Sequence, residues 1–161
     1  MAIREAAVLV LRWGQPERIL VERKNCGLDT YWSCDIALPG GGIRRGESVV
    51  EAALREAWEE AWVHPGMVEV EGVMEPEMTL RGDNRIHPVL ARPRGPLCPM
   101  PASREVDRVF WLDTRLLREE PRRVPHPRRG IIVEGYVVAG GVLWGATLRI
   151  LRRLYHASTT P

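Results

Sequence analysis

The chain has 161 residues, of which 45% are hydrophobic, and its 23 lysines and arginines nearly balance 21 aspartates and glutamates. The hydrophobic fraction is too high for a disordered chain, and the length predicts a single domain over residues 1–161. A net charge of +2 creates no strong field that would attract a polyanion, so composition disfavours a nucleic-acid-binding protein.

Cysteine content and the apolar segments bear on the compartment. Cys26, Cys34 and Cys98 are an odd number without Cys-x-x-Cys spacing, which favours neither a disulfide framework nor a zinc site. Charges at positions 4 and 5 argue against a signal peptide, and the apolar stretch 136–148 is too short to span a bilayer. We therefore expect a cytoplasmic protein that does not bind membranes.

The first half of the chain predicts a hairpin, a short strand and a helix. Apolar residues 6–11 and 19–22 flank a turn with glycine and proline, which is typical of a β-hairpin. Residues 36–38 predict a third strand that runs into a glycine-rich loop. Residues 48–62 predict a helix, because Ser48 and Glu51 form a capping box and apolar residues recur at helical spacing.

The second half predicts strands, loops and a final helix. Three apolar runs have the length of strands: residues 68–74, 86–91 and 106–112. Asp113 is expected to cap a short helical turn, and the proline-rich residues 92–104 and 121–130 predict loops. Residues 142–155 predict a helix with leucines on one face and arginines on the other. Since strands and helices alternate, we expect an α/β layered domain.

Three glutamates gather on one side of the first predicted helix. Glu56, Glu59 and Glu60 are three and four residues apart or adjacent, so they share one arc of its surface. Like charges at this spacing repel by about 0.2–0.5 kcal/mol per pair, and Arg55 cannot neutralise all three. A hard divalent cation can, because Mg²⁺ and Mn²⁺ prefer carboxylate oxygens. From geometry alone, a solvated and salt-bridged face explains the pattern equally well.

Glycines immediately precede this helix. Gly40, Gly41 and Gly42 follow a predicted strand, where packing does not readily explain three residues without side chains. Such a loop lets the backbone approach a ligand closely, and its peptide groups can reach phosphate oxygens or a metal ion. A tight connection between strand and helix is the competing interpretation.

The loop and the helix together form a specific motif. Residues 38–62, LPGGGIRRGESVVEAALREAWEEAW, resemble the Nudix box, G-x5-E-x7-R-E-U-x-E-E-x-G-U, where U is a bulky apolar residue. The fixed positions are occupied by Gly41, Glu47, Arg55, Glu56, Glu59 and Glu60. Trp62 stands where the box has its second glycine, so we expect the helix to continue briefly and to stop before His64-Pro65.

The resemblance implies a fold and a chemistry. The fold is a Nudix-type α/β/α sandwich around a mixed β-sheet. The chemistry is Mg²⁺- or Mn²⁺-dependent hydrolysis of a diphosphate linked to another moiety. Glu56, Glu59 and Glu60 would bind the metal, with the Gly40 carbonyl as a further ligand. Bound cations would screen the charge of the diphosphate, which otherwise repels an attacking water.

Further roles follow from the same resemblance. Glu47 and Arg55 would form an ion pair that steadies the loop and the helix. Glu105, just before the strand at 106–112, is the candidate general base, with an ordinary exposed loop carboxylate as the competing interpretation. A glutamate of the box is the alternative base. Many relatives form dimers, which leaves a homodimer open.

Outside the box, the chain resembles the coenzyme A diphosphatase branch of the family. Residues 105–113, EVDRVFWLD, and 142–155, VLWGATLRILRRLY, are similar to a strand and to the C-terminal helix of that branch. Upstream of the box, Thr30, Cys34 and Leu38 replace the arginine, glycine and phenylalanine of its signature. The resemblance to this branch implies coenzyme A or a derivative as the substrate. ADP-ribose, dinucleotides or nucleoside triphosphates are alternatives, and a non-catalytic nucleotide sensor is the alternative to an enzyme.

Residues near the box are candidates for substrate binding. Arg23 and Lys24 would bind phosphates, since both side chains are cationic, with a solvated strand end as the competing interpretation. The peptide groups of Gly41 and Gly42 would bind phosphate as well.

Aromatic and nucleophilic side chains nearby have ordinary alternatives. Tyr31 and Trp32 are candidates for stacking on a base, although tryptophan more often lies in a core. Cys34 is interpreted as a small buried residue and His87 as structural.

Overall fold

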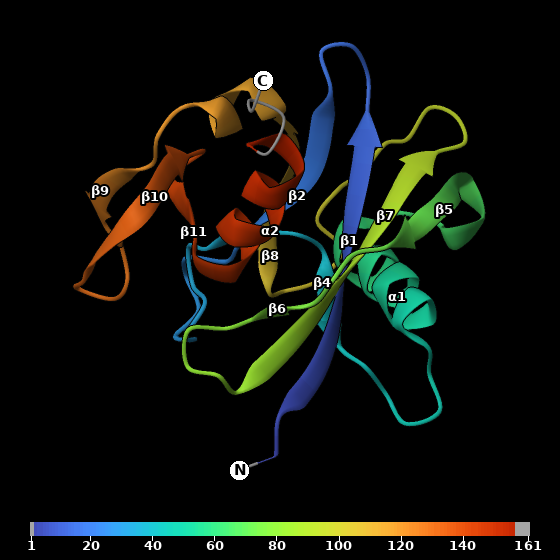
Figure 1. Cartoon of the computed structure of the whole chain (residues 1–161), viewed down its shortest axis with the longest axis horizontal. Helices are drawn as coiled ribbons and strands as arrows, with labels where there is room; N and C mark the ends of the chain where they lie inside the picture. Colours follow the sequence, from blue (N-terminus) through green and yellow to red (C-terminus); the bar gives the residue numbers. More distant parts are fainter. Residues whose placement is uncertain (1, 157–161) are drawn as a thin grey trace.

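The computed structural model describes residues 2–156 (Figure 1). The strands are β1 (Arg4–Trp13), β2 (Arg18–Lys24), β3 (Ile36–Ala37), β4 (Gly40–Gly42), β5 (Val68–Val73), β6 (Glu77–Met78), β7 (Asn84–Pro93), β8 (Val106–Asp113), β9 (Arg122–Pro125), β10 (Ile132–Val138) and β11 (Gly141–Trp144). The helices are α1 (Val49–Ala61) and α2 (Gly145–Tyr155), with 3₁₀ turns η1 (Pro65–Met67) and η2 (Thr114–Arg118). Met1 and residues 157–161 of the predicted domain lie outside the described residues.

Strand β1 lies in the middle of the main sheet. The strand order is β3-β2-β1-β7-β5, and β4 also pairs with β1, β6 with β7 and β8 with β2. β1 and β7 are parallel, whereas the other pairings in this sheet are antiparallel. The sheet is therefore mixed. In Figure 1, the smaller sheet β11-β10-β9 lies to the left, away from α1 and β5.

Side chains of β1 alternate between two buried clusters, as the period of a strand requires. Leu9 and Leu11 pack with the buried alanines of α1. Val10 packs in the other cluster with Leu148 and Leu151 of α2. The predicted α/β/α sandwich around a mixed sheet is confirmed. Within residues 2–156, no helix is both long and apolar enough to cross a membrane.

Helix α1 begins as predicted and ends differently. The Ser48 side chain accepts a hydrogen bond from the Glu51 N–H, and the Glu51 carboxylate accepts one from the Ser48 N–H. The helix does not continue past Trp62, so that prediction was wrong. Trp62 itself adopts the left-handed conformation, with φ of 59°, that glycine usually supplies at a helix end. Its ring stacks on Trp58 with centroids 4.5 Å apart.

The C-terminal third differs most from the prediction. Residues 121–130, expected to form a loop, include strand β9, which pairs with β10. The helix expected from residue 142 begins at Gly145, because residues 141–144 form β11. Ala139 and Gly140 join β10 to β11 with φ of 49° and 76°, and two positive φ values are characteristic of a tight hairpin.

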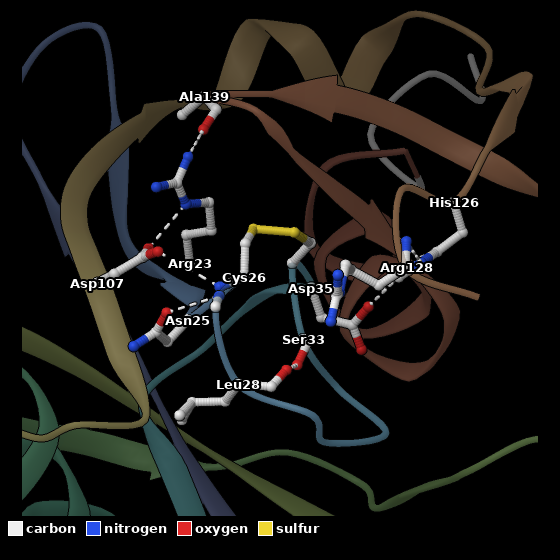
Figure 2. The surroundings of a disulfide bond; sticks show 12 residues. Arg23, Asn25, Cys26, Leu28, Ser33, Asp35, Asp107, His126, Arg128 and Ala139 are labelled. Carbon is white, nitrogen blue, oxygen red and sulfur yellow. Dashed lines mark hydrogen bonds and ion pairs between the residues drawn. A yellow bond between two sulfur atoms is a disulfide. The ribbon is translucent and has the colours of Figure 1, made fainter. Parts of the chain in front are cut away.

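A disulfide closes the segment between β2 and β3 (Figure 2). Cys26 and Cys34 are bonded, which corrects the prediction of no disulfide, and Cys98 is free and exposed. Cys34 is buried, as expected, and has a left-handed φ of 67°. The branch signature has glycine at this position, so the chain keeps a glycine-like backbone without the glycine.

Candidate functional site

Strand β4 brings the backbone against the glutamates of α1. Residues 40–42 were predicted to be a loop but pair with residues 6–8 of β1. The Gly40 N–H donates a hydrogen bond to Glu60 Oε1 at 3.2 Å. A Cβ on Gly41 would lie 2.6 Å from Glu56 Oε1, closer than any real contact. Close approach to the chain's own atoms thus explains Gly40, which lies against Val8, and Gly41, whereas a Cβ on Gly42 would meet nothing within 4 Å. Whether these peptide groups contact phosphate or a metal stays a prediction.

Arg55 connects the loop with the carboxylates. Its Nε donates to Glu47 Oε1 at 2.6 Å, and its Nη1 donates to Glu56 at 2.8 Å and to Glu59 at 3.3 Å. Its Nη2 donates to the Gly42 carbonyl at 3.0 Å. Hydrogen bonds from Arg55, and then from the Arg44 N–H, lower the pKa of Glu47 to about 2. The Glu47–Arg55 pair therefore stays charged across the physiological range.

Glu60 lies in a buried ionic group that the sequence did not predict. Lys24 Nζ lies 2.6 Å from Glu60 Oε2 and 2.8 Å from Glu22 Oε1. Glu22 is fully buried in β2, and neither of its carboxylate oxygens accepts a well-aligned hydrogen bond. A buried carboxylate with incomplete partners is costly, so this group requires positive charge.

Burial changes the protonation of these groups. Desolvation, followed by the neighbouring Glu22, raises the pKa of Glu60. Desolvation also raises the pKa of Glu56, against the opposing effect of Arg55. Burial acts to lower the pKa of Lys24, but Glu22 and Glu60 outweigh it and raise that pKa. Lys24 is therefore a permanent cation beside Glu60, a carboxyl group whose raised pKa opposes its ionisation.

The donor set fits a hard divalent cation in its chemistry. Glu22, Glu56 and Glu60 offer only carboxylate oxygens, which Mg²⁺ and Mn²⁺ prefer. Lys24 pairs with one oxygen of Glu22, and the other has no hydrogen-bond partner among the described residues, so this oxygen is available to a cation. Among residues 2–156, no three acidic, histidine or cysteine side chains converge into a ready-made metal site. Glu59 is about half exposed and faces Arg44 and Arg55 instead.

The other predicted site residues are dispersed. Arg23 does not face the carboxylates: Figure 2 shows it extended between Asp107, at 2.7 Å, and the Ala139 carbonyl, at 2.7 Å. Glu105 is exposed, and its backbone carbonyl accepts a hydrogen bond from the Asn25 N–H, one residue after Lys24.

A pocket of about 390 Å³ adjoins the ionic group. Lys24 lines this pocket and also contacts Glu60, so this one side chain is shared by the pocket and the ionic group. The other lining residues come from distant segments: Arg4, Tyr31, Trp32, Asp35, Ile36, Ala37, Thr79, Leu80, Arg81, Asp83, Asn84, Arg129, Trp144, Gly145, Ala146 and Thr147. Tyr31 and Trp32 are both exposed here, so core packing does not account for them.

Several residues of the site escaped the sequence reasoning. Glu22 carried one signal, because a carboxylate at the end of an apolar strand needs a reason to be there. Asp35 accepts hydrogen bonds from His126 at 2.7 Å, Trp144 at 2.9 Å and Arg129 at 3.2 Å. Partners so far apart along the chain leave no local pattern. His87, interpreted as structural, lies 2.6 Å from Glu5.

Comparison with known proteins places the chain in a family. Residues 3–133 match the family described as "NUDIX domain". A protein from Cronobacter sakazakii named "Uncharacterized Nudix hydrolase NudL" is 35% identical over 162 residues, which cover 94% of this chain and 81% of that protein. A shorter match to NudL of Escherichia coli O1:K1 covers 49% of this chain and 42% of that relative.

Solved structures share the fold. RenU, a Nudix hydrolase from M. smegmatis, has a TM-score of 0.65 at 21% identity, covering 98% of this chain and 88% of that one. The NUDIX domain of Shewanella oneidensis NrtR, complexed with ADP ribose, has a TM-score of 0.64 at 17% identity, covering 99% and 90%. Likeness at this level of identity concerns the fold alone. Since the family match spans most of the sequence, the chain belongs to the NUDIX domain family.

Proposed function

We propose that this protein is a hydrolase, dependent on Mg²⁺ or Mn²⁺, that cleaves the diphosphate bond of a nucleoside diphosphate derivative. The observation that carries the proposal is the group formed by Glu56, Glu60 and the strand Gly40–Gly42, with Glu22 buried beside it. The same box residues would hold the cation, together with Glu59 and the Gly40 carbonyl.

Each residue has a distinct task in this proposal. When bound, the cation would screen the negative charge of the diphosphate and so ease attack by water. Arg55 holds Glu56 in place and ties α1 to the Gly42 carbonyl, while Glu47 fixes Arg55 from the other side. The peptide groups of Gly41 and Gly42 and the ammonium of Lys24 would contact the phosphates. Arg23 is held by Asp107, so we do not assign it this role.

The proton acceptor has two candidates. Glu105 lies at the start of β8, next to the backbone of Asn25, and would have to turn inward to reach an attacking water. Glu60 already lies inside the group, and its raised pKa suits a residue that accepts a proton near neutral pH. A loss of activity in Glu105→Gln that leaves Mn²⁺ binding unchanged would favour Glu105.

Coenzyme A or a derivative is the substrate we favour. Supporting this choice, the similarity to the coenzyme A diphosphatase branch extends over residues 105–113 and 142–155, outside the box. ADP-ribose, dinucleotides and nucleoside triphosphates are the alternatives. The NUDIX domain of Shewanella oneidensis NrtR, which shares the fold, is complexed with ADP ribose. The single domain and the cytoplasmic location stay predictions, and a homodimer stays open.

The decisive experiment is a substrate panel. The protein is incubated with Mg²⁺ or Mn²⁺ and coenzyme A, ADP-ribose, NADH, diadenosine polyphosphates or nucleoside triphosphates, and products are identified by mass. We expect 4′-phosphopantetheine and adenosine 3′,5′-bisphosphate from coenzyme A. Turnover of only the other compounds would reject coenzyme A but keep the hydrolase. Nucleotide binding without any metal-dependent turnover would instead support a non-catalytic sensor.

A further inference from the structure

The first turn of α2 faces the pocket with free backbone donors. Gly145, Ala146 and Thr147 line the pocket. The residue that precedes them, Trp144, makes no side-chain capping hydrogen bond. The first N–H groups of a helix have no partners within it and carry a partial positive charge, which favours an anion.

Arg129 lies beside this helix end with unused hydrogen-bonding capacity. Only 11% of its side-chain surface is exposed, and its Nε is buried without an acceptor in the described residues. Its guanidinium carbon lies 3.7 Å from the Tyr31 ring centroid and 4.7 Å from that of Trp144. Two rings thus fix the plane of the guanidinium, which reduces the entropy that Arg129 loses on binding a ligand.

A second guanidinium shares the same ring. The guanidinium carbon of Arg81 lies 5.1 Å from the Tyr31 centroid, and Arg4 also lines the pocket. Cations held close together repel one another unless an anion lies among them. Tyr31 therefore acts as a positioning residue that gathers arginines from two distant segments.

The acidic side chains of the pocket are already engaged. Asp35 divides its carboxylate among His126, Trp144 and Arg129. Asp83 accepts hydrogen bonds from Thr79 at 2.7 Å and Asn84 at 3.1 Å. Asp83 keeps its charge, because Thr79 and Asn84 are neutral donors whose hydrogen bonds, together with the nearby Arg81, lower its pKa. Lys24 is paired with Glu22 and Glu60, so three arginines, Arg4, Arg81 and Arg129, face these two aspartates, which leaves one positive charge over in the pocket.

From these features we propose that the pocket contains a second phosphate-binding subsite. Arg129, Arg81 and the first turn of α2 form it, and it binds a phosphate monoester that the substrate carries in addition to its diphosphate. The inference rests on the proposed function, since the diphosphate at Glu60 determines where the rest of the substrate lies. It selects nucleotides with an extra phosphate over those, such as ADP-ribose, that lack one.

Binding of two probes in EDTA tests the subsite separately from hydrolysis. Calorimetry compares adenosine 3′,5′-bisphosphate with adenosine 5′-monophosphate, which differ by one phosphate. We expect the bisphosphate to bind about tenfold more tightly or better, the range for one charge-assisted phosphate contact. Equal affinities, or no binding of either probe, would overturn the inference.

Variants of neighbouring arginines locate the subsite. Arg129→Gln should reduce the preference to less than about twofold, whereas Arg128→Gln, which removes an exposed charge from the same loop, should keep it. Arg81→Gln should reduce the preference for the bisphosphate partly. Because it leaves the Asp35 contacts intact, it tests the subsite even if the Arg129 variant does not fold. An unchanged preference in both Arg129→Gln and Arg81→Gln would overturn the assignment. If the protein hydrolyses a diphosphate but binds the bisphosphate and the monophosphate equally well, only the subsite is rejected. If it prefers the bisphosphate but hydrolyses no compound of the substrate panel, only the proposed hydrolase activity is rejected.

Discussion

The carboxylate group and the pocket are neighbours built in opposite ways. The group comes mainly from one continuous stretch, β4 and α1, with Glu22 and Lys24 added from β2. The pocket takes single residues from segments far apart in the chain, among them Arg4, Tyr31 and Trp144. Local construction leaves a motif in the sequence, and distributed construction does not. Chemistry and specificity therefore differ in how readily they can be inferred.

Removing a box carboxylate should lower the rate of hydrolysis and leave nucleotide binding in the pocket unchanged. We expect Glu60→Gln and Glu59→Gln each to lower kcat by more than about 100-fold, the upper range for residues that only support metal ligands. Adenosine 3′,5′-bisphosphate should still bind. The control is Glu69→Gln, an exposed carboxylate on β5. Near-normal turnover by the Glu59 variant would show that Glu59 stays beside Arg44 during the reaction and is not a metal ligand.

Opening the disulfide should weaken nucleotide binding in the pocket and leave metal binding at the carboxylates unchanged. The Cys26–Cys34 bond closes a short segment that carries Tyr31 and Trp32. A double change of both cysteines to serine should lower the free energy of unfolding by about 2–3 kcal/mol, from loop-closure entropy. Nucleotide affinity should fall while Mn²⁺ affinity stays the same. Urea unfolding and calorimetry measure both, with Cys98→Ser as control; identical unfolding with and without reductant would contradict the expectation.

Lys24 belongs to both regions, so its removal tests their independence. Lys24→Met should strengthen Mn²⁺ binding about tenfold, because a permanent positive charge beside Glu60 opposes a divalent cation. Calorimetric titration with Mn²⁺ gives the affinity. The matched control is Glu22→Gln combined with Lys24→Met, which removes one charge of each sign and should return towards the wild-type affinity. Equal affinities of wild type and Lys24→Met would show that Lys24 does not influence the metal.

The smallest effect should come from the end of α1. Trp62→Gly and Trp62→Ala both lose the stacking on Trp58. Alanine at this left-handed position is sterically strained, whereas glycine is not. The glycine variant should be more stable than the alanine variant by about 1 kcal/mol. Chemical unfolding measures the difference. An alanine variant of equal stability would indicate that the helix end rearranges when the tryptophan is lost.

What could be predicted depended on contacts close in sequence. The capping box of Ser48 and Glu51 predicted the start of α1, because both partners lie within one helical turn. Glycine at position 41 predicted a close approach, which the Glu56 carboxylate makes. The fold class followed from the alternation of strands and helices and from the family resemblance.

What could not be predicted depended on distant partners or on ambiguous local signals. The odd number of cysteines hid the Cys26–Cys34 bond, because parity says nothing about which two side chains come close. Residues 142–144 fitted the start of a helix, but pairing with β10 converted them into a strand. Strand β9 lies between prolines on the outside of its sheet, where the usual strand signal is weak.

The junction between β11 and α2 separates two parts of the proposed site along the chain. The family match ends at residue 133, and the glutamates of the box all lie before it, whereas Trp144 and the first turn of α2 lie after it. Under the proposed subsite, substitutions in the first turn of α2 would change phosphate binding without altering any glutamate of the box.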